Sequence, residues 1–223
     1  MIITFATQKG GAGKTTLAIA FANYLALAGN PVRVHDFDFQ KSIHTKWVED
    51  EMLEKPILYE VEIPAHKDMP FADFDTMMRF RNDACIHIFD LAGTLDMRYT
   101  DILQYSDFIV IPFEYSDVSV KSTIVFINFL GLLESEAHKI FVMSRHEQGY
   151  NYPNKEFMDK EIGRFGRILN NGFLKRNALH KIDTRGIDSN LRKMVKPVFE
   201  EMLIHIEEKT GEKLHSLNTN KKD

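Results

Sequence analysis

The sequence predicts an α/β fold with a doubly wound, mostly parallel sheet flanked by helices. Two observations predict it. Apolar runs of strand length alternate with helix-period patterns along the whole 223-residue chain. A glycine-rich loop, residues 9–16 (KGGAGKTT), stands between an apolar run at 2–6 and a helical pattern that begins near Lys14. A strand, such a loop and a helix in this order form a site for phosphate groups.

The composition is that of an ordinary globular protein, with 44% apolar and 27% charged residues. The length fits one domain, which we expect to span residues 1–217, followed by a disordered tail at 218–223. No run of 18 apolar residues predicts a membrane span, and Met1 leads directly into a strand, so no signal peptide is expected. The single cysteine, Cys85, is expected to be a buried, unreactive thiol. These features favour a cytoplasmic location.

The remaining elements follow in order. Gly29 and Pro31 end the first helix, because glycine suits its C-terminal cap and proline cannot continue it. Trp47 is interpreted as a packing residue and not a base-stacking platform, and His87 as a core histidine and not a ligand. Strands are expected at residues 32–35, 57–63, 85–90, 108–112 and 140–143, and helices near residues 42–54, 71–80, 97–105, 118–133 and 154–169.

The last helical pattern has one apolar and one acidic face. The apolar residues are Phe199, Met202, Leu203 and Ile206, and the acidic residues are Glu200, Glu201, Glu207 and Glu208. Helices that lie on a bilayer carry lysine and arginine on their polar face instead. We therefore do not expect this helix to anchor the protein to a membrane.

The loop at 9–16 has the residues that a polyphosphate requires. Gly10, Gly11 and Gly13 can take backbone angles closed to other residues, and they leave their N–H groups open to a phosphate. Lys14 is expected over the β- and γ-phosphates, and the Thr15 hydroxyl is expected to bind Mg²⁺. A glycine-rich turn without a ligand is the structural alternative, and the strand before and the helix after the loop disfavour it.

Acidic residues follow two of the predicted strands. Asp36 and Asp38 follow the strand at 32–35, and Asp90 ends the strand at 85–90. In a parallel sheet the carboxyl ends of these strands lie at the same edge as the phosphate-binding loop. That edge is where Mg²⁺ and an attacking water would lie. Taken without the loop, the two acids after the first of these strands are equally well explained as exposed loop residues.

KGGAGKTT resembles the deviant Walker A motif of the ParA/MinD ATPases. The strict P-loop pattern fails because Gln8 stands where it requires glycine, and Lys9 resembles the family's early lysine, which reaches the partner's phosphates in a nucleotide sandwich dimer. The stretches at 36–42, 85–90 and 107–113 resemble the family's Walker A′ motif, Walker B motif and fifth strand. The resemblance covers most of the chain.

The resemblance implies a role for each matching residue. Lys9, Lys14 and Asp38 would be catalytic, with Asp38 orienting or activating the hydrolytic water. Mg²⁺ would be held by Thr15, by Asp90 through a water, and with support from Asp36. ATP would be bound by the whole loop, namely Lys9, Gly10, Gly11, Ala12, Gly13, Lys14, Thr15 and Thr16.

Three places in the sequence depart from the family pattern. Phe39 stands where proline is usual. Leu91-Ala92-Gly93 stands where the family often has Thr-Pro-Pro or Thr-Pro-Gly, and the missing proline leaves the geometry of this switch open. Ser144 replaces an asparagine that reads adenine in many relatives. Adenine is therefore implied by the family and not by this residue.

The region 175–196 is strongly basic. It holds seven lysines and arginines against two acids, a local charge of +5 in a chain of net charge −4. Such a patch suits the phosphates of DNA, and relatives of the partition type bind DNA nonspecifically through this part of the chain. A solvated basic face is an equally weighted alternative. The seven residues are Lys175, Arg176, Lys181, Arg185, Arg192, Lys193 and Lys196.

The resemblance implies a short, ParA-like Mg-ATPase that forms an ATP sandwich homodimer, binds DNA nonspecifically on the nucleoid, and is reset by slow hydrolysis. A centromere-binding protein of ParB type would stimulate that hydrolysis during partition of a plasmid, chromosome or mobile element. A positioning ATPase for a non-DNA cargo and a small-molecule enzyme of the dethiobiotin-synthetase type remain alternatives. Reductase relatives that hold an iron–sulfur cluster need cysteine pairs, which one cysteine cannot supply.

Overall fold

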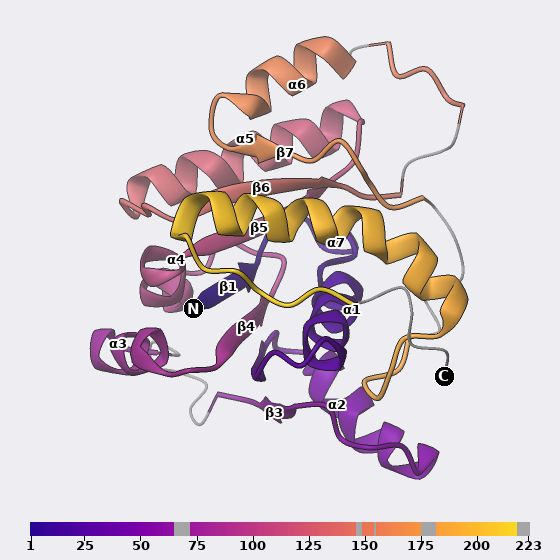
Figure 1. Cartoon of the computed structure of the whole chain (residues 1–223). Helices are drawn as coiled ribbons and strands as arrows, with labels where there is room; N and C mark the ends of the chain where they lie inside the picture. Colours follow the sequence, from indigo (N-terminus) through magenta and orange to yellow (C-terminus); the bar gives the residue numbers. More distant parts are fainter. Residues whose placement is uncertain (65–71, 146–148, 154, 175–181, 218–223) are drawn as a thin grey trace.

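A computed structural model of the chain describes residues 1–64, 72–145, 149–153, 155–174 and 182–217 (Figure 1). Its centre is a sheet of seven strands in the order β3-β2-β4-β1-β5-β6-β7, and every neighbouring pair is parallel. This confirms the predicted fold class. The strands are β1 Ile2–Phe5, β2 Val32–Phe37, β3 Glu60–Glu62, β4 Ile86–Leu91, β5 Phe108–Phe113, β6 His138–Met143 and β7 Arg167–Ile168.

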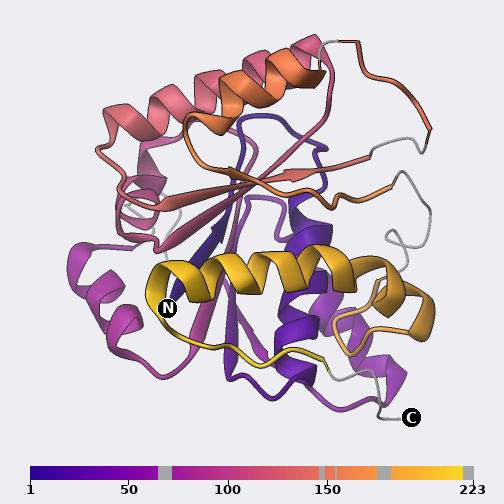
Figure 2. The same ribbon diagram turned by 45° about the horizontal axis from the view of Figure 1, so that its top comes forward.

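Helices cover both faces of the sheet (Figures 1 and 2). Alternate strand residues point to opposite faces, so Ile3 and Phe5 pack under α1, α2 and α7, whereas Ile2 packs under α3, α4, α5 and α6. The helices are α1 Lys14–Leu27, α2 Ser42–Glu49, α3 Phe74–Asn82, α4 Thr100–Tyr105, α5 Asp117–Leu132, α6 Lys155–Gly163 and α7 Ser189–Thr210, with short 3-10 helices η1 Asp50–Leu53 and η2 Met97–Tyr99.

The predicted end of the first helix and the predicted apolar face of the last helix are both confirmed. Gly29 takes φ +92° after α1, and its N–H donates to the Ala26 carbonyl. The predicted apolar stripe of α7 is buried, with the Phe199 ring 5.0 Å from the Phe21 ring of α1. Within the described ranges, no helix is both long enough and apolar enough to cross a bilayer. The tail predicted at 218–223 lies outside the described residues.

The predicted helix at 154–169 is wrong in its second half. Helix α6 ends at Gly163, and the chain then adds β7 to the edge of the sheet beside β6. Gly166 permits this approach, since a Cβ at this position would lie 2.2 Å from the Lys139 carbonyl oxygen. The predicted strand at 57–63 shortens to β3, and Cys85 is half-buried instead of buried.

His87 is a core residue, as predicted, and it forms a pair with His35 of β2. Nδ1 of His87 lies 2.9 Å from Nε2 of His35, so one ring donates to the other. The Phe80 ring stacks on His87 at 4.4 Å between centroids. Burial, with a smaller effect of His35, lowers the pKa of His87 to about 4.

This pair makes folding depend on pH. The folded state binds a proton at His87 less readily than the unfolded chain, where the pKa is 6.5, so the stability that His87 contributes is complete above pH 6.5 and falls as pH drops toward 4. We expect His87 to contribute a loss of ~2 kcal/mol between pH 7.5 and pH 5, measured by urea denaturation as the difference between the parent and His87→Gln. His87→Gln should flatten this dependence, while His215→Gln, the same change at an exposed histidine, should keep it. An unchanged slope in His87→Gln would contradict the assignment.

Candidate functional site

A cleft of about 670 Å³ opens at the carboxyl edge of the sheet. Because the strands are parallel, the loops that follow β1, β2, β4 and β6 all reach this edge. The structure therefore brings together most of the residues that the sequence predicted for the phosphate site. The cleft is lined by Gly10, Gly11, Gly13, Lys14, Thr15, Thr16, Asp38, Phe39, Gln40, Ser42, Ala92, Gly93, Thr94, Asp96 and Arg145.

The phosphate-binding loop has the expected strained turns. Gly11 and Gly13 take φ +75° and +87°, which side chains with a Cβ rarely adopt, and Gly13 directly precedes the first turn of α1. Gly10 does not have a positive φ. Instead, Gly93 from the loop after β4 lies against it, and a Cβ on Gly93 would come within 2.8 Å of the Gly10 amide nitrogen. Gly93 thus makes a close backbone contact with the phosphate-binding loop.

Thr15, which lines the cleft, is in contact with Asp90 of β4. The Thr15 hydroxyl donates to Asp90 Oδ2 at 2.7 Å. The other oxygen, Oδ1, is buried and has no hydrogen-bond partner among the described residues. Burial raises the pKa of Asp90 to about 7, and the charges of Asp36 and Asp38 add to this against the opposing effect of Lys14 and Thr15. A buried carboxyl with an unsatisfied oxygen between a hydroxyl and further acids fits Mg²⁺, which prefers such ligands.

The two predicted acids at the end of β2 have different surroundings, because Asp36 lies within the strand and Asp38 follows it. Asp36 is fully buried, and its oxygens accept the backbone N–H groups of Asp38 and His44 at 3.3 and 2.9 Å. Its contacts order the loop and the start of α2, and burial raises its pKa. Asp38 is half-buried and lines the cleft, and its Oδ1 accepts the Gln40 N–H at 2.9 Å. A direct metal contact from Asp36 stays a prediction.

Glu114 and Arg145 join the site without having been predicted. Nζ of Lys9 lies 3.9 Å from Glu114, and the Arg145 guanidinium lies 3.8 Å from the other oxygen of the same carboxylate. Ser144 anchors this side, because its hydroxyl donates to the Ala12 carbonyl at 3.0 Å. Glu114 sits just beyond β5, and only that place at the carboxyl edge could have identified it.

Arg185 is buried, so its place in the predicted basic surface is wrong. It is 4% exposed, its guanidinium lies 5.1 Å from the centre of the Trp47 ring, and Nη2 donates to the Trp47 carbonyl at 2.9 Å. A side chain held in this way is not presented to a phosphate. Trp47 is a packing residue, as predicted, and donates from Nε1 to the Tyr59 carbonyl.

The rest of the predicted basic surface divides into two parts. Arg192, Lys193 and Lys196 lie on the first turns of α7, where Lys193 is exposed and Lys196 pairs with Glu200 at 3.5 Å. Lys175, Arg176 and Lys181 lie outside the described residues. The part that the structure describes is therefore a short basic segment on one helix.

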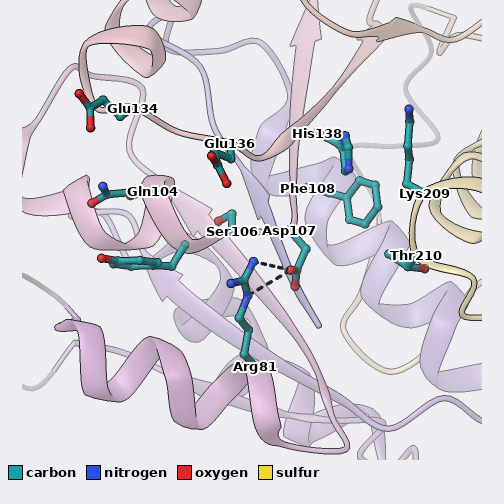
Figure 3. Close-up of a pocket in the computed structure, with 11 residues that line it drawn as sticks. Arg81, Gln104, Ser106, Asp107, Phe108, Glu134, Glu136, His138, Lys209 and Thr210 are labelled. Atoms are coloured by element: carbon teal, nitrogen blue, oxygen red, sulfur yellow. Dashed lines mark hydrogen bonds and ion pairs between the residues drawn. The ribbon is translucent and has the colours of Figure 1, made fainter.

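A second hollow, of about 590 Å³, lies at the opposite edge of the sheet. Figure 3 shows Glu134 and Glu136 on one side of it and His138 and Lys209 on the other. At its base the Arg81 guanidinium donates to Asp107 Oδ1 at 2.9 Å, while Asp107 Oδ2 accepts the Ile2 N–H at 2.7 Å. These groups satisfy each other and secure β1, so their role is structural.

Comparison with protein families gives one match, the family described as CobQ/CobB/MinD/ParA nucleotide binding domain, over residues 3–209. No curated protein sequence matches the chain.

Several solved structures share the fold. A plasmid partition protein from Borrelia burgdorferi B31 bound to AMPPNP is 20% identical, with a TM-score of 0.70 over 92% of this chain and 98% of the other. A chain of the Aquifex aeolicus MinC:MinD cell division protein complex is 14% identical, with a TM-score of 0.68 over 100% of this chain and 99% of the other. The structure of pNOB8 ParA bound to nonspecific DNA is 14% identical, with a TM-score of 0.65 over 93% of this chain and 98% of the other.

Proposed function

The chain belongs to the CobQ/CobB/MinD/ParA family of nucleotide-binding domains, and on this premise we propose that it is a ParA-like Mg-ATPase that acts in DNA partition. The observation that carries the proposal is the contact between Thr15 and Asp90 under the phosphate-binding loop. It supports the proposal because Asp90 Oδ1, buried and without a hydrogen-bond partner among the described residues, is the kind of oxygen ligand that Mg²⁺ prefers. The AMPPNP bound by the Borrelia burgdorferi relative supports the choice of an adenine nucleotide.

The residues of the cleft divide the work of hydrolysis. The loop N–H groups and Lys14 bind and orient the phosphates. Asp38, which faces the cleft from the other side, orients the attacking water and draws its proton. Thr15 and Asp90 would hold Mg²⁺, which neutralises phosphate charge when it is bound.

The position of Lys9 supports assembly of the chain into a homodimer. In the single chain its ammonium lies 3.9 Å from Glu114, and the Lys9 side chain is 37% exposed, so a partner's nucleotide can reach it. A triphosphate attracts it more strongly than one carboxylate does. We infer a homodimer with two nucleotides between the subunits, in which each Lys9 contacts the partner's phosphates.

We propose that this dimer binds DNA. Arg192, Lys193 and Lys196 on α7, together with Lys175 and Arg176, supply cations for the phosphate backbone. The dimer doubles the number of phosphates held at once, which makes binding depend on ATP. The DNA bound by pNOB8 ParA supports this choice, and a centromere-binding protein of ParB type is the proposed stimulating partner.

A mobility-shift titration with random-sequence duplex DNA tests the proposal. Replacing Arg192, Lys193 and Lys196 together with Glu should weaken ATP-dependent binding at least tenfold and spare ATP-driven dimerisation. For the parent, the log–log dependence on salt should have a slope of roughly −0.9 per phosphate contacted. The matched control is the same charge change at Arg79, Lys121 and Lys160, which are exposed on α3, α5 and α6.

Two outcomes would contradict the proposed DNA binding. One is equal binding of the parent with ATP and with ADP, and the other is a loss of binding by the control triple variant as complete as that of the α7 variant. A parent that hydrolyses ATP but does not bind DNA would favour a positioning ATPase for another cargo.

A further inference from the structure

Tyr99 lies between the two loops that carry the switch residues. It ends η2 and is 1% exposed. Its hydroxyl donates to the Phe37 carbonyl at 2.7 Å and accepts the Ala92 N–H at 3.3 Å. Phe37 and Leu91 are the last paired residues of β2 and β4, so the hydroxyl bridges the two strands where their ladder ends. Burial raises the pKa of Tyr99, which keeps this hydroxyl protonated and able to donate.

Each end of this bridge is one residue from the nucleotide cleft. Phe37 precedes Asp38, the acid proposed to orient the water. Ala92 precedes Gly93, which lies against Gly10 of the phosphate-binding loop. One buried hydroxyl therefore links the residue before Gly93 to the residue before Asp38.

A second contact joins the same two loops on the surface. The Arg98 guanidinium lies 4.6 Å from the centre of the Phe39 ring, and Asp96 holds that guanidinium through contacts with Nε and Nη2 at 3.0 and 2.6 Å. Phe39 is 49% exposed, so this contact does not serve the core. Phe39 stands where proline is usual in the family, and its ring takes part in this contact.

We propose that Tyr99 is a positioning residue that couples the backbone at Gly93 to Asp38, so that a terminal phosphate at the first fixes the carboxylate at the second. Tyr99 touches no reacting atom, and it acts through the two loops that it joins. The inference rests on the proposed ATP hydrolysis, but the coupling can be measured without hydrolysis.

The test compares hydrogen exchange of the full chain with and without Mg-AMPPNP. In the parent, we expect the nucleotide to slow exchange in residues 9–16, 36–42 and 92–98 together. Tyr99→Phe keeps the buried ring and loses only the hydroxyl. It should retain the slowing at 9–16 and at 92–98 and lose it at 36–42. Nucleotide affinity should stay within about twofold, while single-turnover ATP hydrolysis falls roughly tenfold.

Tyr105→Phe is the matched control. It makes the same chemical change at the end of α4, where the ring packs on Phe74 away from both loops, and it should behave like the parent. Phe39→Ala, at an exposed side chain, gives a second variant that does not depend on core packing. It should cause a smaller loss of slowing in the same segment.

The outcomes separate the coupling from the activity. If Tyr99→Phe keeps the slowing at 36–42, or loses the slowing at 9–16 as well, Tyr99 is only a structural residue and the proposal is wrong. A parent that shows the coupled exchange pattern but no ATP hydrolysis would overturn the proposed reaction and leave the coupling standing.

Discussion

Lys14→Ala is expected to abolish Mg-ATP binding, with a loss of affinity of about 100-fold or more. Lys14 opens α1 directly after the left-handed Gly13, and it is 5% exposed among the loop residues that line the cleft. A charged donor to a phosphate contributes ~1.5–3 kcal/mol per contact, and the predicted position spans two phosphates. Isothermal titration calorimetry with Mg-ATP measures the change directly.

The control for this variant is Lys121→Ala, which removes the same charge from the exposed face of α5. It should bind Mg-ATP as tightly as the parent does. The thermal midpoint of Lys14→Ala without nucleotide shows whether the fold survives. Binding of Mg-ATP by a folded Lys14→Ala protein at parental affinity would mean that the loop at 9–16 is not the phosphate site.

Lys9→Ala and Asp38→Ala should separate assembly from chemistry. Lys9→Ala removes the cation proposed to cross to the partner, so it should bind Mg-ATP and remain a monomer. Asp38→Ala removes the group proposed to orient water, so it should dimerise with ATP and hydrolyse it ~100-fold more slowly. Light scattering with ATP gives the mass, and phosphate release gives the rate.

Glu114→Gln is the control for the first of these variants. It removes the charge that Lys9 approaches within its own chain and keeps the lysine itself. Dimerisation should persist in Glu114→Gln, which shows that loss of the Lys9–Glu114 pair is not the cause of the Lys9→Ala defect. A Lys9→Ala protein that dimerises normally would rule out the crossing lysine.

The sequence predicted the parts of the fold that local patterns determine. Strands buried on both faces appear as apolar runs, and the glycine-rich loop between a strand and a helix indicates its own conformation. The edge strand β7 was missed because it is only two residues long. It also depends on the close contact of Gly166 with Lys139 of β6, which local patterns do not reveal.

The residues of the site also divide into those that local spacing predicts and those that depend on contacts distant in the sequence. Lys14, Thr15, Asp38 and Asp90 could be placed from spacing, since parallel strands bring their carboxyl ends together. Arg185 could not, because its burial against Trp47 comes from a contact between segments 138 residues apart. Tyr99 lacked a signal for a related reason, since a tyrosine in a helical pattern predicts a packing ring, and only the structure shows where its hydroxyl lies.

The central place of β1 affects how the chain folds during synthesis. Its neighbours β4 and β5 follow it in the chain by roughly 85 and 105 residues. At ~5–20 residues per second, a ribosome exposes Ile2–Phe5 for about 4–20 s before either neighbour can pair with it. All four of these residues are fully buried in the finished sheet. During that interval the segment is apolar chain without its sheet partners, and its nonlocal pairing belongs to the slow class of folding steps.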